Sequence, residues 1–279
     1  MISVIIPSRG RPDLLRECIR SLTMIAADIE IVVGLDQDDP ELAEYQRALR
    51  LGYVRTVIEG RHPTSASLSN RLALHHAKGD WLLMFTDDAR VREEDWAFLL
   101  EKRVQKLPKQ LGVVYLNDPM LPGFPTFPVV SRKTVEMVGF FNAPWFPFLY
   151  GDDWWNEIGD LSTFKIEASD VSVSYTKCEG MSDHIHDFAF WQSFFDYLRP
   201  LRVSVAAKML REVHGETMVA SALLGTMAKR EAACAKAHSY RLTAEWCESR
   251  QSKHPPTPRY LAAKAKAEQI MYGKERAAA

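Results

Sequence analysis

The stretch that decides the fold is WLLMFTDDAR, residues 81–90. Its apolar residues have the length and composition of a buried strand, and the run ends in two adjacent carboxylates. Carboxylates at the end of a buried strand are costly unless a cation pairs with them. A hard divalent cation, Mg²⁺ or Mn²⁺, held by one or two carboxylates and otherwise by phosphates and water, would satisfy Asp87 and Asp88. The alternative is that this pair caps the next helix.

On both sides of this stretch, short apolar runs alternate with amphipathic stretches, a pattern typical of an α/β sheet with mainly parallel strands. The predicted strands cover Ser3–Pro7, Ile29–Leu35, Tyr53–Ile58, Trp81–Thr86, Gly112–Leu116 and Ser169–Tyr175. The predicted helices cover Arg11–Met24, Glu41–Leu51, Thr64–Ala77, Glu93–Lys106 and a short segment from Gly151. The Pro- and aromatic-rich segment Pro119–Tyr150 is predicted to be irregular and to form a pocket wall. Ligands of open α/β sheets bind at the carboxyl ends of strands, where Asp87 and Asp88 fall.

The composition favours a soluble globular protein. With 47% hydrophobic and 25% charged residues, the 279-residue chain has enough apolar material for one sizeable core and a smaller appended region. The first apolar run is too short for a signal peptide, and no stretch approaches the ~20 apolar residues of a membrane span. The four cysteines lack the paired spacing of a zinc site. We therefore expect a cytoplasmic protein with reduced thiols.

The charge is unevenly distributed along the chain. Residues 1–200 carry 21 Lys and Arg against 29 Asp and Glu, whereas residues 201–279 carry 14 against 7. The front is therefore −8 and the tail +7, and from Phe188 onward the composition is that of helices. A basic tail is typical of contact with a polyanion, such as nucleic acid or an acidic membrane surface. The alternative is a helical face solvated by Lys and Arg.

Three segments in order, SVIIPSRGRPDLLRECIRSL, EIVVGLDQDDP and SNRLALHHAKGDWLLMFTDDAR, resemble the nucleotide-binding half of the family 2 glycosyltransferases. The resemblance covers about residues 1–160. It implies the GT-A fold, a Rossmann-like α/β nucleotide-binding sheet flanked by helices, and a nucleoside diphosphate sugar as donor, a UDP-sugar by family default. It also implies that Asp36 accepts from the base N–H, Asp87 faces the ribose and Asp88 holds the metal on the diphosphate. The other residues that it places at the nucleotide sugar are Pro7, Ser8, Arg9, Arg11 and Asn70.

The sequence departs from the family at two positions. Thr86 stands where an acid is commoner, although some members have Thr-Asp-Asp there. Ser69 stands where the family often has an Arg before Asn70. A cation for the diphosphate must then come from elsewhere, and the candidates are Arg9, Arg11, Arg61 and Arg71.

A later segment, FPVVSRKTVEMVGFFNAPWFPFLYGDDWWNEIG, is similar to the family's acceptor side, where a Gly-Glu-Asp motif carries the catalytic base. An inverting transfer needs a carboxylate that removes the proton of the acceptor hydroxyl. The similarity implies Asp153 for this role and Asp152 as the second choice; the alternative is a capping pair. Trp145, Trp154 and Trp155 are predicted to offer flat surface to the acceptor. Core packing would explain at least one of them equally well.

The segment Asp183–Asp187, DHIHD, follows the last predicted strand. Many GT-A enzymes take a further metal ligand from a histidine at about this position. The rings of an extended His-x-His point to the same side, so His184 or His186 is a candidate ligand. The alternative is a surface pair.

These features predict a GT-A domain over residues 1–187, with a nucleotide-sugar-binding half 1–117 and an acceptor-side half 118–187, and a helical, basic C-terminal region 188–279. The expected function is an inverting glycosyltransferase that depends on Mn²⁺ or Mg²⁺. The acceptor is either a hydroxylated base in nucleic acid, as in some phage DNA-modifying enzymes, or a surface polysaccharide or lipid-linked glycan, with the tail on a membrane. A nucleotidyltransferase and a non-catalytic sugar-nucleotide binder are the alternatives of another class.

Overall fold

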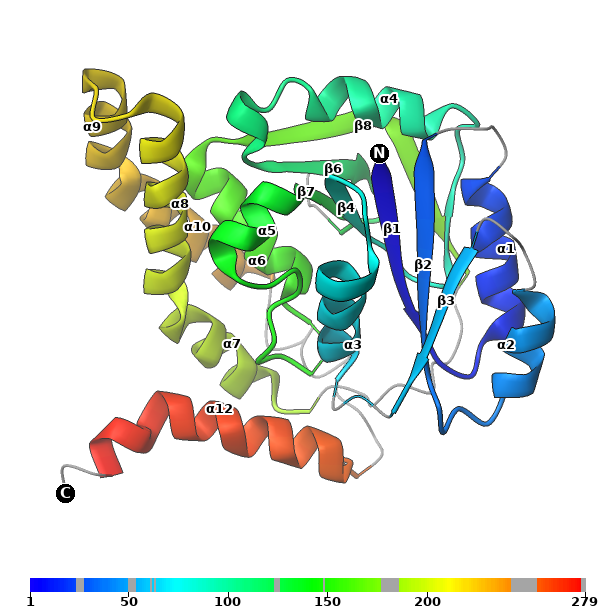
Figure 1. The fold of residues 1–279 in the computed structure, drawn as a ribbon. Coiled ribbons are helices and arrows are strands. Elements are labelled where there is room, and N and C mark those ends of the chain that lie inside the picture. Colours follow the sequence, from blue (N-terminus) through cyan, green and yellow to red (C-terminus); the bar gives the residue numbers. More distant parts are fainter. Residues whose placement is uncertain are drawn as a thin grey trace.

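The protein folds around a mixed β-sheet with helices on both faces (Figure 1). We describe it from a computed structural model, which covers residues 1–23, 28–49, 54–60, 62, 64–122, 126–147, 149–176, 186–241 and 255–276. In these residues the sheet has eight strands in the order β3-β2-β1-β4-β7-β6-β8-β5. The strands are β1 (Ile2–Ser8), β2 (Ile29–Asp36), β3 (Val54–Glu59), β4 (Trp81–Met84), β5 (Ala89–Val91), β6 (Val113–Asn117), β7 (Pro128–Ser131) and β8 (Lys165–Tyr175).

The parallel strands β1 to β4 bring their carboxyl ends to one edge of the sheet. In the register of β1, Ser8 lies beside Leu35 of β2, and Ile5 lies beside Met84 of β4. Buried apolar residues fill β1, β2 and β4, as both faces are covered by helices, whereas the edge strand β3 is largely exposed. The residues that directly follow β1, β2 and β4 therefore meet at this edge, as the sequence predicts.

The helices before residue 163 confirm most of the predicted ones. They are α1 (Pro12–Leu22), α2 (Leu42–Ala48), α3 (Ser65–Arg71), the π-turn η1 (Leu72–His76), α4 (Trp96–Val104), the 3₁₀ turn η2 (Pro108–Gln110), α5 (Arg132–Val138) and α6 (Gly151–Ser162). In α1, Pro12 occupies the first turn and Leu15, Cys18 and Ile19 form the buried face, which explains why this segment is helical.

The prediction that Pro119–Tyr150 is irregular is wrong for its middle part, which forms β7 and α5. Ser131 caps α5, because its hydroxyl accepts from the backbone N–H of Thr134 at 3.0 Å. Gly139, with a φ of 92°, ends the helix in the left-handed conformation. Strand β7 runs antiparallel to both neighbours, β4 and β6. The short strand β5, right after the Asp pair, was also not predicted.

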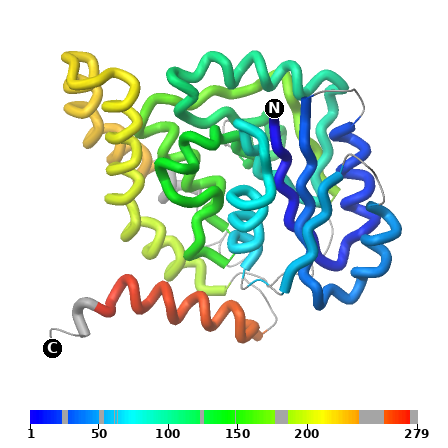
Figure 2. The backbone as a smooth tube through the Cα atoms, viewed as in Figure 1, coloured from blue at the N-terminus to red at the C-terminus, as the bar shows by residue number. Residues whose placement is uncertain are grey.

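The C-terminal region is helical, as predicted. Its described helices are α7 (Phe188–Tyr197), α8 (Arg199–His214), α9 (Met218–Gly225), α10 (Met227–Arg241) and α12 (Pro258–Arg276). Helix α8 packs on α6, and side chains from both regions share one hydrophobic core. The chain trace shows α12, in red, crossing the molecule on the side where the parallel strands end (Figure 2). Among the described helices, none is both long and apolar enough to cross a bilayer.

Candidate active site

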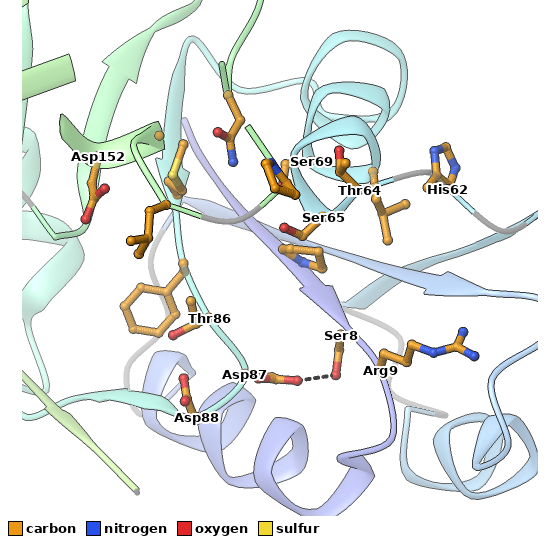
Figure 3. A pocket seen from close by; sticks show the side chains of 18 of the residues that line it. Ser8, Arg9, His62, Thr64, Ser65, Ser69, Thr86, Asp87, Asp88 and Asp152 are labelled. Atoms are coloured by element: carbon orange, nitrogen blue, oxygen red, sulfur yellow. Dashed lines mark hydrogen bonds between the residues drawn. The ribbon is translucent and has the colours of Figure 1, made fainter. Parts of the chain in front are cut away.

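A cavity of about 650 Å³ opens where the parallel strands end. One wall comes from the strand ends, with Pro7, Ser8, Arg9, Asp36, Asp87 and Asp88. The others come from the start of α3, the start of α6, the end of β8 and the start of α12. Figure 3 shows side chains from the strand ends, from α3 and from α6 around one space. The sequence-predicted residues of β1, β2 and β4 are thus brought together.

Asp87 is completely buried at the bottom of the cavity. The Ser8 hydroxyl donates to it at 2.5 Å and lies 2.7 Å from the Tyr45 hydroxyl (Figure 3 shows the first bond). The Tyr45 oxygen in turn accepts from the backbone N–H of Arg11 at 2.7 Å. Burial raises the pKa of Asp87 to about 6, although Arg11 and Ser8 act in the opposite direction. A chain of hydrogen bonds therefore fixes this carboxylate before any ligand arrives.

Arg11 bridges the two adjacent aspartates. Its guanidinium lies 2.9 Å from Asp87 and 3.7 Å from Asp88. This ion pair is what offsets the cost of two carboxylates at the end of a buried strand. The Asp88 side chain is about one-quarter exposed and faces the cavity.

The residues at Asp88 fit a hard divalent cation only in part. In the described parts of the chain, no three His, Cys, Asp or Glu side chains gather around a common centre. A carboxylate oxygen facing an open cavity is nevertheless the ligand that Mg²⁺ or Mn²⁺ uses when phosphates and water complete its shell. Asp88 would therefore hold such an ion together with a bound diphosphate.

Asp36 forms a second polar corner of the cavity. It is 5% exposed, and it accepts from the backbone N–H of His62 at 3.0 Å and from Arg9 at 3.1 Å. Arg9 also donates to Asp38 at 2.7 Å. The guanidinium and the carboxylates at this corner suit the polar edge of a base.

The start of α6 places Asp152 in the cavity wall, where Figure 3 shows its carboxylate. Asp153, the first choice from the sequence, is not among the described residues that line the cavity. The Asp152 carboxylate accepts from the backbone N–H of Asp153 at 3.0 Å. Both remain candidates for the base, and the geometry favours Asp152.

The hydrogen bonds of Asn70, which is predicted to contact the donor, run to the acceptor-side segment. Its side-chain oxygen accepts from the backbone N–H groups of Phe141 and Asn142 at 2.7 and 2.9 Å, and its amide donates to the carbonyl of Asn142 at 2.6 Å. Asn142 in turn packs against Gly151, where a Cβ atom would lie 2.4 Å from the Asn142 Oδ1. Asn70 therefore positions the segment on which the start of α6 rests.

The prediction that Trp154 and Trp155 offer a surface to the acceptor is wrong, because both rings are buried in the core. Trp154 packs against Phe140 and Trp145, and the Trp155 indole N–H donates to the carbonyl of Phe141 at 2.8 Å. Trp145 is partly buried against this cluster and is not one of the described lining residues. The sequence could not separate ligand stacking from core packing, since both use aromatic residues.

Of the two histidines predicted as metal ligands, only His186 lies in the described part of the chain. His184 and Arg61 lie outside the described residues. His186 is half-buried, its ring packs edge-on against Tyr260 at 5.0 Å, and its carbonyl accepts from the Tyr260 hydroxyl. Its imidazole is thus engaged in packing on α12.

Tyr175, Arg259 and Tyr260 are among the lining residues that were not predicted from the sequence. Tyr175, at the end of β8, donates its hydroxyl to the buried Asp118. Arg259 and Tyr260 reach the cavity from α12, more than 170 residues after Asp87 in the chain. Nothing in the local sequence signals these roles, because they depend on where α12 docks.

The mixed sheet flanked by helices has the GT-A fold. Solved structures of glycosyltransferases share it. The mannosyltransferase PcManGT from Pyrobaculum calidifontis, in complex with GDP-Man and Mn²⁺, is 16% identical over 96% of this chain and 86% of that chain, with a TM-score of 0.54. Residues 1–349 of TarS from S. aureus are 13% identical, with 98% and 81% covered and a TM-score of 0.54. TarS 1–349 in complex with UDP is 14% identical, with 88% and 76% covered and a TM-score of 0.52.

The sequence comparison agrees with the fold. Residues 3–117 match the model of the family described as Glycosyl transferase family 2. The predicted resemblance to the family 2 glycosyltransferases is therefore confirmed over residues 3–117, and the fold of the chain is GT-A. No curated protein sequence matches the chain.

Proposed function

We propose that the protein transfers a sugar from a nucleoside diphosphate sugar to an acceptor hydroxyl, with inversion at the anomeric carbon. One observation carries the proposal: Asp87, Asp88 and Asp152 face one cavity at the carboxyl ends of the parallel strands, although they come from two distant segments. PcManGT, similar in fold, was solved with GDP-Man and Mn²⁺, and TarS with UDP. The carboxylates of such a cavity suit the hydroxyls of a donor of this class and a divalent cation on its diphosphate.

In this proposal the donor occupies the wall formed by the strand ends. The corner at Asp36 and Arg9 takes the base, and the ribose lies next to the buried Asp87. Asp88 would hold Mn²⁺ or Mg²⁺ together with the diphosphate. A bound divalent cation neutralises charge that develops on the departing diphosphate. Arg11, already at 2.9 Å from Asp87, keeps this carboxylate oriented.

Asp152 is the proposed base. Its carboxylate takes the proton from the acceptor hydroxyl while the acceptor oxygen forms its bond to the anomeric carbon. The bond between that carbon and the diphosphate oxygen breaks, and the electron pair leaves with the nucleoside diphosphate. Because attack and departure occur on opposite faces of the sugar ring, the configuration inverts.

A pair of adjacent variants tests the base. We expect Asp152→Asn to lower the transfer rate by about 10²-fold or more, because general base catalysis contributes about this much. Asp153→Asn is the matched control and should retain most of the activity. Donor affinity, measured by titration with UDP and GDP in the presence of Mn²⁺, should be similar in both. Full transfer by Asp152→Asn, with loss in Asp153→Asn, would assign the base to Asp153 instead.

The cation is tested at Asp88. The Asp88→Ala variant should lose the Mn²⁺-dependent part of nucleotide binding, while the fold is retained because this side chain is partly exposed. A variant that binds UDP and GDP with unchanged Mn²⁺ dependence would remove the cation from this position. A nucleotidyltransferase is distinguished by its products, since it releases pyrophosphate instead of a nucleoside diphosphate.

The acceptor class is decided by direct comparison. Labelled UDP- and GDP-sugars are incubated with the protein and with hydroxymethylated DNA, oligosaccharides or lipid-linked acceptors. The basic C-terminal region favours a polyanionic acceptor or surface in general terms. Transfer to DNA, with an affinity that falls as salt rises, would support the nucleic-acid alternative. Transfer to glycans alone would exclude it. Donor binding without transfer to any acceptor would favour the non-catalytic binder.

A further inference from the structure

Three aromatic rings form a row at one side of the cavity. The ring centroids of Phe85 and Phe127 lie 5.0 Å apart, and those of Phe127 and Tyr175 lie 5.6 Å apart. All three residues line the cavity, but Phe85 and Phe127 are almost completely buried, whereas Tyr175 is partly exposed. Tyr175 is therefore the ring of this row that a ligand in the cavity can reach.

The Tyr175 ring is held in place by its hydroxyl. This group donates to Asp118, which is 1% exposed and also accepts from the backbone N–H of Met120 at 2.9 Å. Asp118 is not among the described residues that line the cavity, so the hydroxyl is directed into the protein. Burial raises the pKa of Tyr175 and Asp118 raises it further, so the phenol stays protonated and keeps donating. Tyr175 thus presents a fixed aromatic ring to the cavity.

Tyr175 lies near both the proposed cation residue and the proposed base. Strand β8 pairs with β5, and the backbone N–H of Thr176 donates to the carbonyl of Asp88 at 2.9 Å. Asp152 lines the same cavity, and after burial and Asp118 its charge also raises the pKa of Tyr175. In the proposed reaction the attacking hydroxyl and the sugar that it attacks meet between the diphosphate and the base. Tyr175 is therefore next to the place of reaction.

We propose that the acceptor is an uncharged sugar, whose ring packs on Tyr175 with its attacking hydroxyl at Asp152. This inference rests on the proposed function. The face of an aromatic ring carries partial negative charge, which suits the C–H groups on the apolar face of a sugar ring. The sequence predicted an aromatic surface for the acceptor from Trp145, Trp154 and Trp155, and the proposal moves this surface to the end of β8.

The charge of this part of the molecule favours an uncharged acceptor over nucleic acid. Residues 1–200, which supply the strand ends, the start of α6 and Tyr175, carry 21 Lys and Arg against 29 Asp and Glu. The excess of basic residues lies after residue 200. A nucleic acid would bring several phosphates to an acidic surface, which repels them. A sugar ring brings hydroxyls, which can donate to a carboxylate such as Asp152.

The test measures the use of the acceptor and the binding of the donor separately. Wild type, Tyr175→Phe, Tyr175→Leu and Tyr175→Ala are supplied with labelled UDP- and GDP-sugars and Mn²⁺. The acceptors are methyl glycosides of glucose, galactose, mannose and N-acetylglucosamine, beside hydroxymethylated DNA. UDP and GDP are titrated into each protein, and their affinity should change less than about twofold, because the nucleotide is placed on the strand ends.

The expected effect falls on the acceptor. For the glycoside that wild type uses best, the Michaelis constant should rise about tenfold or more in Tyr175→Ala, because contact with an apolar ring is lost. Tyr175→Leu fills more of the space without an aromatic face and should show most of this rise. Tyr175→Phe keeps the ring and should stay within about threefold of wild type.

Tyr272→Ala is the matched control, since Tyr272 is an exposed tyrosine that does not line the cavity. It should use every acceptor like wild type. Unfolding curves show whether each variant keeps the fold, which matters most for Tyr175→Phe, because Asp118 there stays buried without its donor. NMR gives a measurement without turnover. With UDP or GDP and Mg²⁺ present, saturation of aromatic protein protons should reach the C–H protons of the glycoside in wild type and much less in Tyr175→Leu.

Several outcomes would overturn the proposal. An unchanged Michaelis constant in a folded Tyr175→Ala protein would remove Tyr175 from the acceptor site while leaving the proposed function intact. Transfer to DNA alone, or nucleotide binding with no glycoside bound, would exclude an uncharged sugar as acceptor. Weaker binding of the nucleotide sugar relative to the free nucleotide, with unchanged acceptor use, would assign the ring to the donor's own sugar. If wild type neither binds UDP and GDP nor transfers a sugar, the proposed function itself fails.

Discussion

At the scale of single residues, Asp87 is unusual because a fully buried carboxylate is held by a serine, an arginine and a tyrosine-linked network. Its environment contains opposing effects. Desolvation favours the neutral form, whereas Arg11 and Ser8 favour the ionised form, and desolvation is the larger. The result is a carboxylate that is costly to bury in the free protein but correctly oriented for a ligand.

This balance predicts how stability depends on pH. The pKa of Asp87 is raised from 3.8 to about 6 in the folded protein, so between these values the folded state binds more protons than the unfolded state. The contribution of Asp87 to stability should therefore fall as pH rises from 4 to 7, by about 3 kcal/mol for two pKa units at ~1.4 kcal/mol each. Urea unfolding of wild type and Asp87→Asn across this range, with EDTA present, isolates the contribution.

The comparison uses the change with pH, because Asp87→Asn also alters the contacts with Ser8 and Arg11 by a constant amount. As pH rises, the free energy of unfolding of wild type should fall relative to that of Asp87→Asn. A pH-independent difference would show that the pKa of Asp87 is not raised in the folded protein.

Asn70 yields a second prediction at this scale. Asn70→Ala removes three hydrogen bonds to the backbone of Phe141 and Asn142, so we expect a loss of about 2–3 kcal/mol of stability at ~1 kcal/mol per bond. The transfer rate should fall with it, because these bonds support the segment against which α6 begins. UDP and GDP affinity should change little. A selective loss of nucleotide affinity, with stability unchanged, would restore the sequence-based role of Asn70 at the donor.

At this scale the sequence predicts positions better than contacts. Asp87 could be placed at the site because it follows a buried strand, and strand ends converge in a parallel sheet. Ser8 and Asp36 are placed there by the resemblance to the family. The tryptophans of α6 could not be assigned, since an aromatic ring next to a catalytic motif packs equally well inward or outward. Tyr45 gave no signal, because its partner Ser8 lies 37 residues away.

At the scale of elements, the start of α6 depends on the absence of a side chain at one position. Gly151→Ala would place a Cβ 2.4 Å from Oδ1 and 3.1 Å from Cγ of Asn142, so we expect it to destabilise the protein by ~1–3 kcal/mol despite the better helix propensity of alanine. Adding Asn142→Ala removes both clashing atoms while leaving its backbone bonds to Asn70. Thermal unfolding of the single and double variants should show recovery in the double variant.

If Gly151→Ala alone is as stable as wild type, the Asn142 side chain moves away freely and the close approach has no energetic weight.

The same region shows where prediction of elements fails. Ser131 and Gly139 are good cap signals for α5, but the many Pro and aromatic residues around them led to the prediction of an irregular segment. Strand β5 is three residues long, and its pairing with β8 over 80 residues away could not be deduced from local pattern.

At the scale of the whole molecule, the predicted division at residue 187 marks a change in composition, yet the hydrophobic core continues across it. Arg202 of α8 is fully buried and forms an ion pair with Glu157 of α6, which is 4% exposed. The guanidinium lies 3.6 Å from the ring centroid of Phe195 and burial lowers its pKa. Charge counts along the sequence suggested a solvated or polyanion-binding tail, and they gave no sign that one arginine is internal.

This buried pair predicts how strongly the two regions are coupled. Replacing Glu157 by Leu leaves the Arg202 guanidinium buried without its carboxylate, which should cost about 3–5 kcal/mol. Arg199 also loses its pair with Glu157, but it keeps its ion pair with Asp196 at 2.6 Å, so the cost there is smaller. Combining Glu157→Leu with Arg202→Met removes both charges, and most of the loss should be recovered. Guanidinium chloride unfolding measures each variant, with one cooperative transition expected because the two regions share a core.

The exposed pair Lys133–Glu212, which also joins the two regions, is the matched control. Both side chains are more than 40% exposed, so Lys133→Ala should change stability by less than about 1 kcal/mol. A similar cost for this variant and for Glu157→Leu would mean that burial does not decide the contribution of the internal pair. Two separate unfolding transitions in wild type would mean that residues 188–279 fold as a unit of their own. Such a result would also contradict the placement of Arg259 and Tyr260 in the cavity wall, because that placement depends on the docking of the C-terminal helices.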